Sequence, residues 1–190
     1  MNSFAQAPAV TEPFAHVRLD NWFGDALQDA ALAWLETDAP WRLRVASFYE
    51  QYEFSLLVDK PPSAAAALIS AETVADVAAL FADRFQTADL ELVDITAHRL
   101  VVGQTIRVHN DYIGGAETHR MLVQLNRGWD AANGGLLMLF DSDRAEDVSA
   151  VIIPRHGSAL AFAISPKSFH AVSTIVSGAR FTLVYTFRKP

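Results

Sequence analysis

Eight short β-like segments follow one another after residue 88, and this series constrains the fold more than any other feature of the chain. Gly, Pro, Asn and Asp residues separate the segments, as expected for strands joined by turns. Strands this short and this closely spaced are typical of a sandwich, a jelly roll or a barrel. The segments read LELVDITAHRLVV, QTIRVHNDY, HRMLVQLN, GGLLMLF, SAVIIP, SALAFAI, FHAVSTIV and ARFTLVYTFR.

The first 87 residues have a different pattern, which predicts two helical segments separated by strands. From Asp20, the segment DNWFGDALQDAALAWLE starts with candidate Asp and Asn caps and repeats apolar residues at helical spacing until Pro40. An Ala-rich run over 63–85 follows two prolines, and Ser70 is a candidate cap for a second helical piece within it. Between the helices, WRLRVASFYE and QYEFSLLV have the alternation and aromatic content of strands.

These patterns predict one mainly β domain with α, spanning residues 1–190. A chain of 190 residues is about the size of one domain and can bury one sizeable core. We expect a loose leader over 1–13, a helical supporting layer over 14–87, and an antiparallel β double sheet over 88–188. The N-terminal helices should pack on one face of one sheet.

Composition excludes several functional classes. The net charge of −7 and the scattered Lys and Arg residues argue against a nucleic-acid partner and against an anionic membrane surface. Because there is no Cys, any metal site must use His, Asp and Glu. The first 13 residues lack a signal-peptide pattern, and no stretch approaches the ~18 apolar residues of a membrane span. We therefore expect a cytoplasmic protein without a membrane partner.

Three candidate metal ligands stand in two of the predicted strands. His109 and Asp111 end the segment QTIRVHND, and strand alternation points both to the same side, roughly 6.6 Å apart along the chain. His170 stands in FHAVSTIV, where only strand pairing could bring it close to the other two. Two histidines and one carboxylate are the ligand set of non-haem Fe(II) oxygenases, with open positions on the metal. An isolated H-x-D, however, is more often a surface contact than a metal site.

Arg180 is a cation in a strand that should face the β interior. Alternation in ARFTLVYTFR puts Arg180 and Thr182 on one face and the aromatic residues on the other. A buried guanidinium is costly unless an anion meets it. Its partner could be one of the chain's own carboxylates at a sheet edge, or a small carboxylate ligand held bidentately with help from the Thr182 hydroxyl.

The order of several motifs resembles the Fe(II)/2-oxoglutarate-dependent dioxygenases, especially the prolyl-4-hydroxylase-like branch. The first motif is G-Q-x-I-x-x-H-x-D, and an Arg, a Leu-Asn, a Gly-Trp and a Gly-Gly follow it. P-x-x-G-x-x-x-x-F, H-x-V and G-x-R complete the series, which is more specific than any one motif. The resemblance covers roughly residues 88–188, at Gly103–Asp111, Arg120, Leu125, Asn126, Gly128, Trp129, Gly134, Gly135, Pro154, Gly157, Phe162, His170, Val172, Gly178 and Arg180.

This resemblance implies a double-stranded β-helix, or jelly-roll, core. It also implies that His109, Asp111 and His170 hold iron and that Arg180 binds the distal carboxylate of 2-oxoglutarate. Two positions depart from the family pattern. Leu136 stands where a Glu is usual, and Leu100 stands where a Tyr often helps to hold the cosubstrate. The candidate replacements for the lost Tyr hydroxyl are Gln124 and Thr182.

Several residues near the first motif are candidate substrate contacts. Tyr112 and Glu117 lie in the glycine-containing loop after Asp111, and such loops commonly cover substrate. His119 and Arg120 follow this loop, although an isolated His such as His119 is more often structural. The remaining histidines, His16, His98 and His156, have no partner at ligand spacing. The aromatic segment SFYEQYEFSL could dock a peptide, but core packing is the simpler interpretation.

The sequence thus predicts an enzyme that uses Fe(II), 2-oxoglutarate and dioxygen. We expect it to hydroxylate a C–H bond of a peptide or protein residue, including a ribosomally synthesised peptide, with release of succinate and CO2. The chain has little beyond its core and helical layer, which favours an open site. Two alternatives stay open: an oxygenase acting on a free amino acid or small natural product, and a non-catalytic jelly-roll or cupin-like binding module. The same kind of iron centre catalyses hydroxylation, desaturation and ring formation, so the sequence does not distinguish among these reactions. The oligomeric state does not follow from the sequence either.

Overall fold

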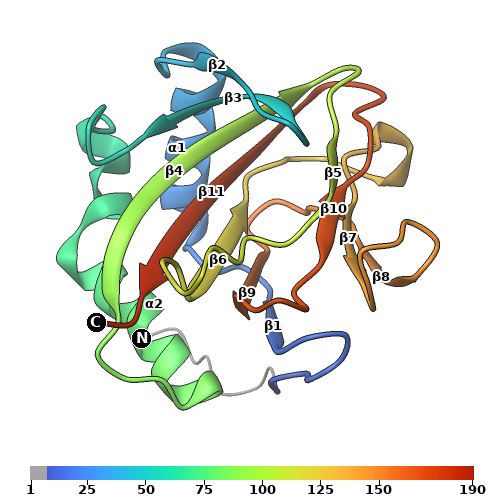
Figure 1. The fold of residues 1–190 in the computed structure, drawn as a ribbon. Coiled ribbons are helices and arrows are strands. Elements are labelled where there is room, and N and C mark those ends of the chain that lie inside the picture. The colour runs from blue at the N-terminus through green and yellow to red at the C-terminus, as the bar shows by residue number, and fades with distance from the viewer. Residues whose placement is uncertain (1–7) are drawn as a thin grey trace.

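Two antiparallel sheets face each other in the computed structural model, which describes residues 8–190 (Figure 1). The larger sheet has the strand order β1-β9-β6-β11-β4-β3-β2, and the smaller has the order β5-β10-β7-β8. All eight strands predicted after residue 88 are confirmed. The strands are β1 (His16–Leu19), β2 (Arg42–Val45), β3 (Glu50–Ser55), β4 (Glu91–Val101), β5 (Ile106–His109), β6 (His119–Gln124), β7 (Leu137–Phe140), β8 (Val148–Ile152), β9 (Ala159–Ala163), β10 (His170–Val172) and β11 (Ala179–Arg188).

The C-terminal strand β11 separates two apolar cores. It pairs with β4 on one side and with β6 on the other, so it runs through the middle of the larger sheet. Its outer side chains, which include Phe181 and Tyr185, pack in the core beneath the helices, and Tyr185 Oη donates a hydrogen bond of 2.8 Å to Leu68 O. Its inner side chains, which include Arg180 and Val184, face the space between the two sheets. The predicted division of this strand into two faces is confirmed.

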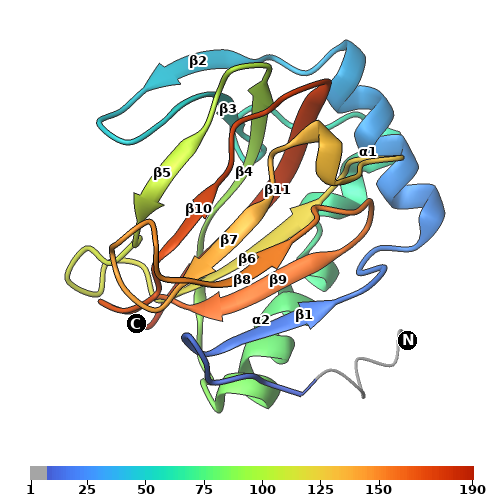
Figure 2. The same ribbon diagram turned by 90° about the vertical axis from the view of Figure 1, so that its right-hand side faces the viewer.

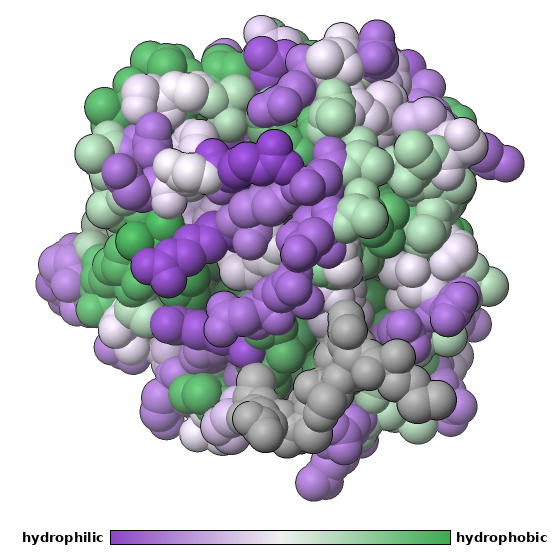
Figure 3. Space-filling model, turned by 180° about the vertical axis from the view of Figure 1, so that it is seen from behind, coloured by the Kyte–Doolittle hydropathy of each residue, from purple (hydrophilic) through white to green (hydrophobic). Residues whose placement is uncertain are grey.

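Helices cover the face of the larger sheet that points away from the smaller sheet (Figure 2). They are α1 (Asp25–Thr37), the 3-10 helix η1 (Ser63–Ile69) and α2 (Ala71–Phe85). Ser70 divides the last two as predicted, because its hydroxyl accepts a hydrogen bond from Thr73 N at 3.1 Å and so caps α2. Seen from behind, hydrophilic side chains separate the hydrophobic patches of the surface (Figure 3).

The first helix begins later than its sequence pattern predicts. Gly24 is the N-cap residue and α1 starts at Asp25, so Asp20 and Asn21 do not cap it. Asn21 instead adopts a left-handed conformation with φ 52°, which turns the chain before the helix. Trp22 and Phe23 are buried, but they pack from this turn and not from a helical face.

Residues 14–87 contribute strands as well as helices. The sequence pattern predicts β2 and β3, which form the β2-β3-β4 part of the larger sheet. It does not predict β1, a four-residue strand that pairs with β9 and forms the opposite edge of this sheet. Of the expected leader, residues 1–7 lie outside the described part of the chain. Within the rest, Val10 pairs with His16 through two backbone hydrogen bonds of 2.8 and 2.9 Å.

The expectation that no stretch is apolar enough to span a membrane is wrong when only length and composition are considered. By these two criteria, the 23-residue helical stretch Ser63–Phe85 is long and apolar enough to cross a membrane. Within the fold, this segment is interrupted at Ser70, whose backbone is extended with ψ 151°. Several of its apolar side chains pack in the core under the larger sheet, namely Ala65, Leu68, Val77, Leu80 and Phe81.

Candidate metal and cosubstrate site

The three candidate metal ligands converge at one edge of the smaller sheet. His109 ends β5 and is paired directly with His170 of β10, and Asp111 follows two residues after His109. Their ligand atoms all lie within 4.8 Å of one another. Asp111 Oδ1 is 3.6 Å from His109 Nε2, and Asp111 Oδ2 is 3.4 Å from His170 Nε2. The strand pairing that the sequence could not specify therefore completes the triad.

Backbone carbonyl groups fix the orientation of both imidazole rings. His109 Nδ1 lies 2.9 Å from Arg107 O, and His170 Nδ1 lies 2.9 Å from Ser168 O. A proton on each Nδ1 satisfies these carbonyls and leaves each Nε2 as a lone-pair donor directed at the triad. Hydrogen bonds of this kind commonly orient histidines that ligate metals.

The charge states of the triad suit a divalent cation. Burial lowers the pKa of His170 to about 4, so its imidazole is neutral near pH 7. Burial alone would raise the pKa of Asp111, but the Arg120 guanidinium and the two histidines hold it well below its usual range. A neutral imidazole and an ionised carboxylate are the forms in which these side chains bind metals.

Arg120 extends from β6 into the triad. Its Nη1 atom lies 2.7 Å from Asp111 Oδ2, and its Nη2 atom forms an ion pair with Glu117. Of the predicted substrate-contact residues, Arg120 and Glu117 thus lie beside the candidate ligands. Tyr112 follows Asp111 directly and is 45% exposed, at the start of the loop that leads to Glu117.

Arg180 is buried on the inner face of β11 and has no hydrogen-bond or ion-pair partner among the described residues. Its side chain is 3% exposed, its Nε has no hydrogen-bond partner, and no carboxylate of residues 8–190 forms an ion pair with it. Burial lowers the pKa of Arg180 to about 10, which still leaves the guanidinium charged near pH 7. The alternative that Arg180 pairs with one of the chain's own carboxylates therefore has no support in the described residues. An unpaired buried guanidinium instead fits an anionic ligand.

Close packing around Gly135 shapes the wall beside Arg180. A Cβ atom at Gly135 would lie 2.6 Å from Ile175 Cδ1 and 3.0 Å from Arg180 Cδ. Trp129 packs against the same glycine, and its Nε1 donates a hydrogen bond of 2.9 Å to Gly134 O. Trp129 is thus a packing residue of the β6–β7 connection, as its sequence context suggests.

The two candidate replacements for the family's Tyr hydroxyl are bonded to each other. Thr182 Oγ1 donates a hydrogen bond of 3.0 Å to Gln124 Oε1, and both residues are 3% exposed. The Gln124 Nε2 atom is buried without a partner. Of this pair, the Gln124 amide nitrogen is thus the free hydrogen-bond donor. Leu100 packs in the apolar core between the sheets.

The connection between β2 and β3 supplies site residues that the sequence pattern did not identify. The Phe48 ring stacks on the His109 ring with centroids 4.4 Å apart, and Phe48 O accepts a hydrogen bond from Arg107 N at 3.0 Å. Tyr49 pairs with Ile106 of β5. The core interpretation of SFYEQYEFSL holds for Phe54, which is 4% exposed, but it is wrong for Phe48. The high density of aromatic residues in SFYEQYEFSL was the sequence signal that could have identified Phe48 as a site residue.

His98 lies on the same inner face as Leu100 and was also not identified. Its Nε2 lies 3.0 Å from Thr96 Oγ1. Burial lowers the pKa of His98 to about 3, and the positive charges of Arg120 and Arg180 add to this effect. His98 is therefore a neutral polar group within the field of both arginines. Strand alternation in β4 predicts that His98 and Leu100 share one face. The spacing of His98 from other polar residues, however, does not indicate a functional role.

His119 lies on the opposite face of β6 from Arg120. Its ring packs against Phe81 and Phe85 of α2, with centroids 5.0 and 6.0 Å away, and it is 3% exposed. This position beneath the helices separates it from the triad. The structure therefore places His119 away from the candidate substrate site. This agrees with the expectation that an isolated His is more often a structural residue.

We expect His119 to make the fold sensitive to mild acid. Burial lowers the pKa of His119 to about 4, while in the unfolded chain the imidazole keeps its ordinary pKa of about 6.5. The unfolded state therefore binds the proton first as the pH falls below 6.5, and the free energy of unfolding should decrease by up to about 1 kcal/mol per pH unit. Urea unfolding at pH 7 and pH 5 measures this loss. In the His119→Gln variant, the loss should be smaller; an unchanged pH dependence would contradict the assignment.

Comparisons with known proteins place this geometry in a family. Residues 95–188 match the model of the 2OG-Fe(II) oxygenase superfamily. This segment contains all three candidate metal ligands and Arg180. The protein is accordingly a 2-oxoglutarate-dependent non-haem iron dioxygenase, and its cofactor and cosubstrates are Fe(II), 2-oxoglutarate and dioxygen. The alternative of a non-catalytic binding module is not supported.

Solved structures of other oxygenases share the fold. A prolyl-4-hydroxylase from Pseudomonas putida superposes with a TM-score of 0.71 at 18% identity, covering 92% of each chain. A Trichoplax adhaerens prolyl hydroxylase in complex with a hypoxia inducible factor peptide fragment has a TM-score of 0.73 at 13% identity, covering 91% of this chain and 83% of that one. The epimerase SnoN from nogalamycin biosynthesis has a TM-score of 0.67 at 10% identity, covering 92% and 77%. No curated protein matches the chain.

Proposed function

We propose that this dioxygenase hydroxylates a C–H bond in a peptide or protein, with release of succinate and CO2. The observation that carries the proposal is the His109-Asp111-His170 triad together with the buried Arg180, whose Nε has no partner. The triad would hold Fe(II), and Arg180 would bind the distal carboxylate of 2-oxoglutarate, with the Gln124 amide and the Thr182 hydroxyl beside it. When bound, the iron and 2-oxoglutarate together supply the activation of dioxygen.

The chain's own residues would position the reactants. The carbonyls of Arg107 and Ser168 keep the two Nε2 atoms aimed at the metal, and the Phe48 ring shields one face of His109. Burial around Arg180 excludes water, so a carboxylate there would bind in a fixed orientation. Arg120, now paired with Asp111 and Glu117, would turn its guanidinium toward the substrate once a metal neutralises Asp111.

An open groove beside the triad supports a peptide substrate. The groove runs between the β2–β3 and β4–β5 connections and has a volume of about 490 Å³. Val45 and Val102, which are 70% and 61% exposed, line it together with Phe48, whose ring contacts His109. Arg107 and Gln104 add polar groups. An exposed groove with apolar and polar walls suits an extended segment of peptide.

The ion pair between Arg120 and Glu117 favours a second candidate substrate, a free amino acid. These side chains offer one cation and one anion next to the triad, and they would complement the carboxylate and ammonium groups of a zwitterion. The structural likeness to an epimerase of nogalamycin biosynthesis is consistent with a small substrate of this kind.

The experiment that tests the proposal measures succinate formed from 2-oxoglutarate with pools of peptides and with free amino acids. We expect peptides to stimulate succinate formation and the substrate to gain one oxygen atom. Val102→Asp should raise the KM for the peptide about tenfold and leave succinate formation without peptide unchanged. Val58→Asp is the control, because Val58 is 78% exposed but lies outside the groove. Stimulation by amino acids alone, lost in Arg120→Gln, would favour the second candidate.

A further inference from the structure

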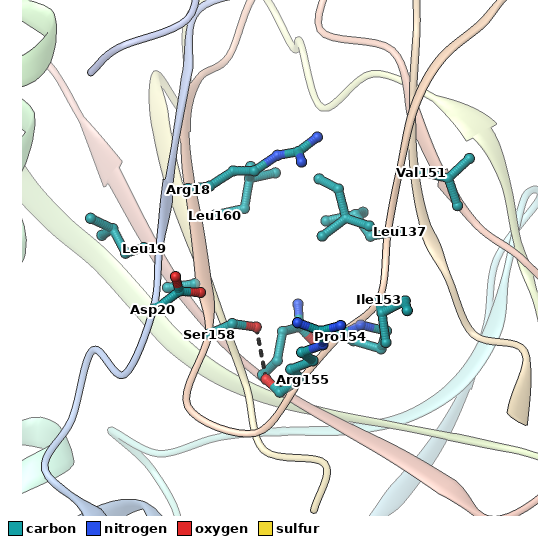
Figure 4. Close-up of a pocket in the computed structure, with 13 residues that line it drawn as sticks. Arg18, Leu19, Asp20, Leu137, Val151, Ile153, Pro154, Arg155, Ser158 and Leu160 are labelled. Atoms are coloured by element: carbon teal, nitrogen blue, oxygen red, sulfur yellow. Dashed lines mark hydrogen bonds between the residues drawn. The ribbon is translucent and has the colours of Figure 1, made fainter. Parts of the chain in front are cut away.

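A second pocket lies between the two sheets, away from the triad and from Arg180. It opens where β1 and β9 of the larger sheet face β7 and β8 of the smaller one, and it has a volume of about 300 Å³ (Figure 4). The triad ligands and Arg180 are not among its lining residues. Gln124 also lines the pocket, and its Oε1 atom accepts a hydrogen bond from the Thr182 hydroxyl of the candidate cosubstrate site.

The rim of this pocket carries two exposed arginines that no carboxylate neutralises. Arg18 extends from β1 and Arg155 from the β8–β9 connection, and they lie on different sides of the hollow in Figure 4. Within residues 8–190, neither side chain forms an ion pair or a hydrogen bond. Other exposed arginines of this acidic chain do pair with carboxylates, namely Arg42, Arg44, Arg127, Arg144 and Arg188.

One carboxylate, that of Asp20, also lines the pocket, but it lies outside ion-pair distance of both arginines. Two cations against one anion leave the rim with a net positive charge. Arg18 and Arg155 thus place two unneutralised cations at one pocket of a protein whose net charge is −7. This charge would attract an anion of low charge.

The walls of the pocket are aliphatic. Leu137 of β7 and Leu160 of β9 lie on two sides of the hollow (Figure 4), and Ile152, Val151 and Pro154 also line it. Apolar walls below a cationic rim are complementary to a molecule that has a hydrocarbon body and an anionic end. The volume is at the lower end of the range of small-molecule sites, about 300–1,000 Å³, so it suits a small ligand.

We propose that this pocket binds a small aliphatic monocarboxylate. Its carboxylate would lie between the Arg18 and Arg155 guanidinium groups, and its hydrocarbon chain would lie against Leu137, Ile152 and Leu160. Gln124 borders both this pocket and the candidate cosubstrate site, but Arg18 and Arg155 do not belong to the latter, so the proposal does not depend on which substrate the enzyme hydroxylates. It would be filled at the same time as the site around Arg180.

Calorimetric titration with hexanoate tests this site. The protein is loaded with Fe(II) and saturated with 2-oxoglutarate without oxygen, so that the Arg180 site is already filled. We expect hexanoate to bind under these conditions, and hexanol, which lacks the charge, to bind about tenfold more weakly. Arg18→Gln and Arg155→Gln should each weaken hexanoate binding about three- to tenfold. Added salt should weaken it further, because the arginines are exposed.

Arg144→Gln is the matched control. Arg144 is also exposed and lies after β7, but it pairs with Glu146 and does not line the pocket. This variant should bind hexanoate as the wild type does. Competition between hexanoate and 2-oxoglutarate would overturn the proposal, because it would place the carboxylate at Arg180. Wild-type affinity for hexanoate in the Arg18→Gln and Arg155→Gln variants would also overturn it. So would the absence of binding to the wild-type protein at millimolar hexanoate.

Discussion

Replacing His170 with alanine should lower Fe(II) affinity at least about 100-fold and abolish turnover. The substitution removes one of three ligands, and the remaining pair, His109 and Asp111, cannot close the set. His170 is buried, and its Nδ1 lies 2.9 Å from Ser168 O. Among residues 8–190, no other His, Asp or Glu belongs to this cluster and could take its place. Anaerobic calorimetry with Fe(II), together with succinate formation from 2-oxoglutarate, measures both effects.

His156→Ala is the control for the loss of a histidine. His156 Nε2 lies 3.1 Å from Asp29 Oδ1 of α1, and His156 does not belong to the ligand cluster. This variant should bind Fe(II) and turn over as the wild type does. Wild-type Fe(II) affinity in a folded His170→Ala protein would contradict the metal assignment.

Replacing Arg180 with glutamine should weaken 2-oxoglutarate binding on the order of 100-fold while Fe(II) affinity stays within about threefold. A buried guanidinium that holds a carboxylate contributes about 2–5 kcal/mol, and each 1.4 kcal/mol corresponds to a factor of ten. The effect should appear in the KM for 2-oxoglutarate, because Arg180 does not belong to the triad. Arg188→Gln, on the same strand but exposed and paired with Glu91, should change neither value.

The Arg180 variant also has a readout that is independent of activity. In the ligand-free protein, the guanidinium is buried without a partner, which is a cost to folding. Arg180→Gln should therefore leave the thermal unfolding temperature of the ligand-free protein unchanged or raise it. It should also reduce the stabilisation that added 2-oxoglutarate confers. A large loss of stability in the ligand-free variant, or equal loss of Fe(II) affinity, would show that Arg180 has a different role.

Local periodicity explains why much of the site could be predicted. Strand alternation predicts that His109 and Asp111 point to one side, although β5 ends at His109, and it puts Arg180 with Thr182 on the inner face of β11. The proximity of His170 depends on the β5–β10 register, which the residues themselves do not specify. The ordered motifs supplied that information through the family resemblance.

What the sequence pattern missed depends on long-range pairing. Phe48 reaches His109 only because the β2–β3 connection pairs with β5, about 60 positions along the chain. The β1 strand is four residues long and gains its stability from β9, so its own sequence carries little signal. Asn21 has a left-handed backbone conformation, so the helix does not begin there as its sequence pattern predicts. A pattern of capping residues does not reveal such a conformation.

The most direct test of the central claim is anaerobic visible spectroscopy of the metal-free protein, titrated with Fe(II) and then with 2-oxoglutarate. The measurement needs no knowledge of the substrate. If the triad and Arg180 together form an iron and 2-oxoglutarate site, the wild type should develop a visible charge-transfer band on addition of 2-oxoglutarate. His170→Ala should show no band, and Arg180→Gln should show it only at much higher 2-oxoglutarate. A folded wild-type protein without the band, or a His170→Ala protein that keeps it, would contradict the account.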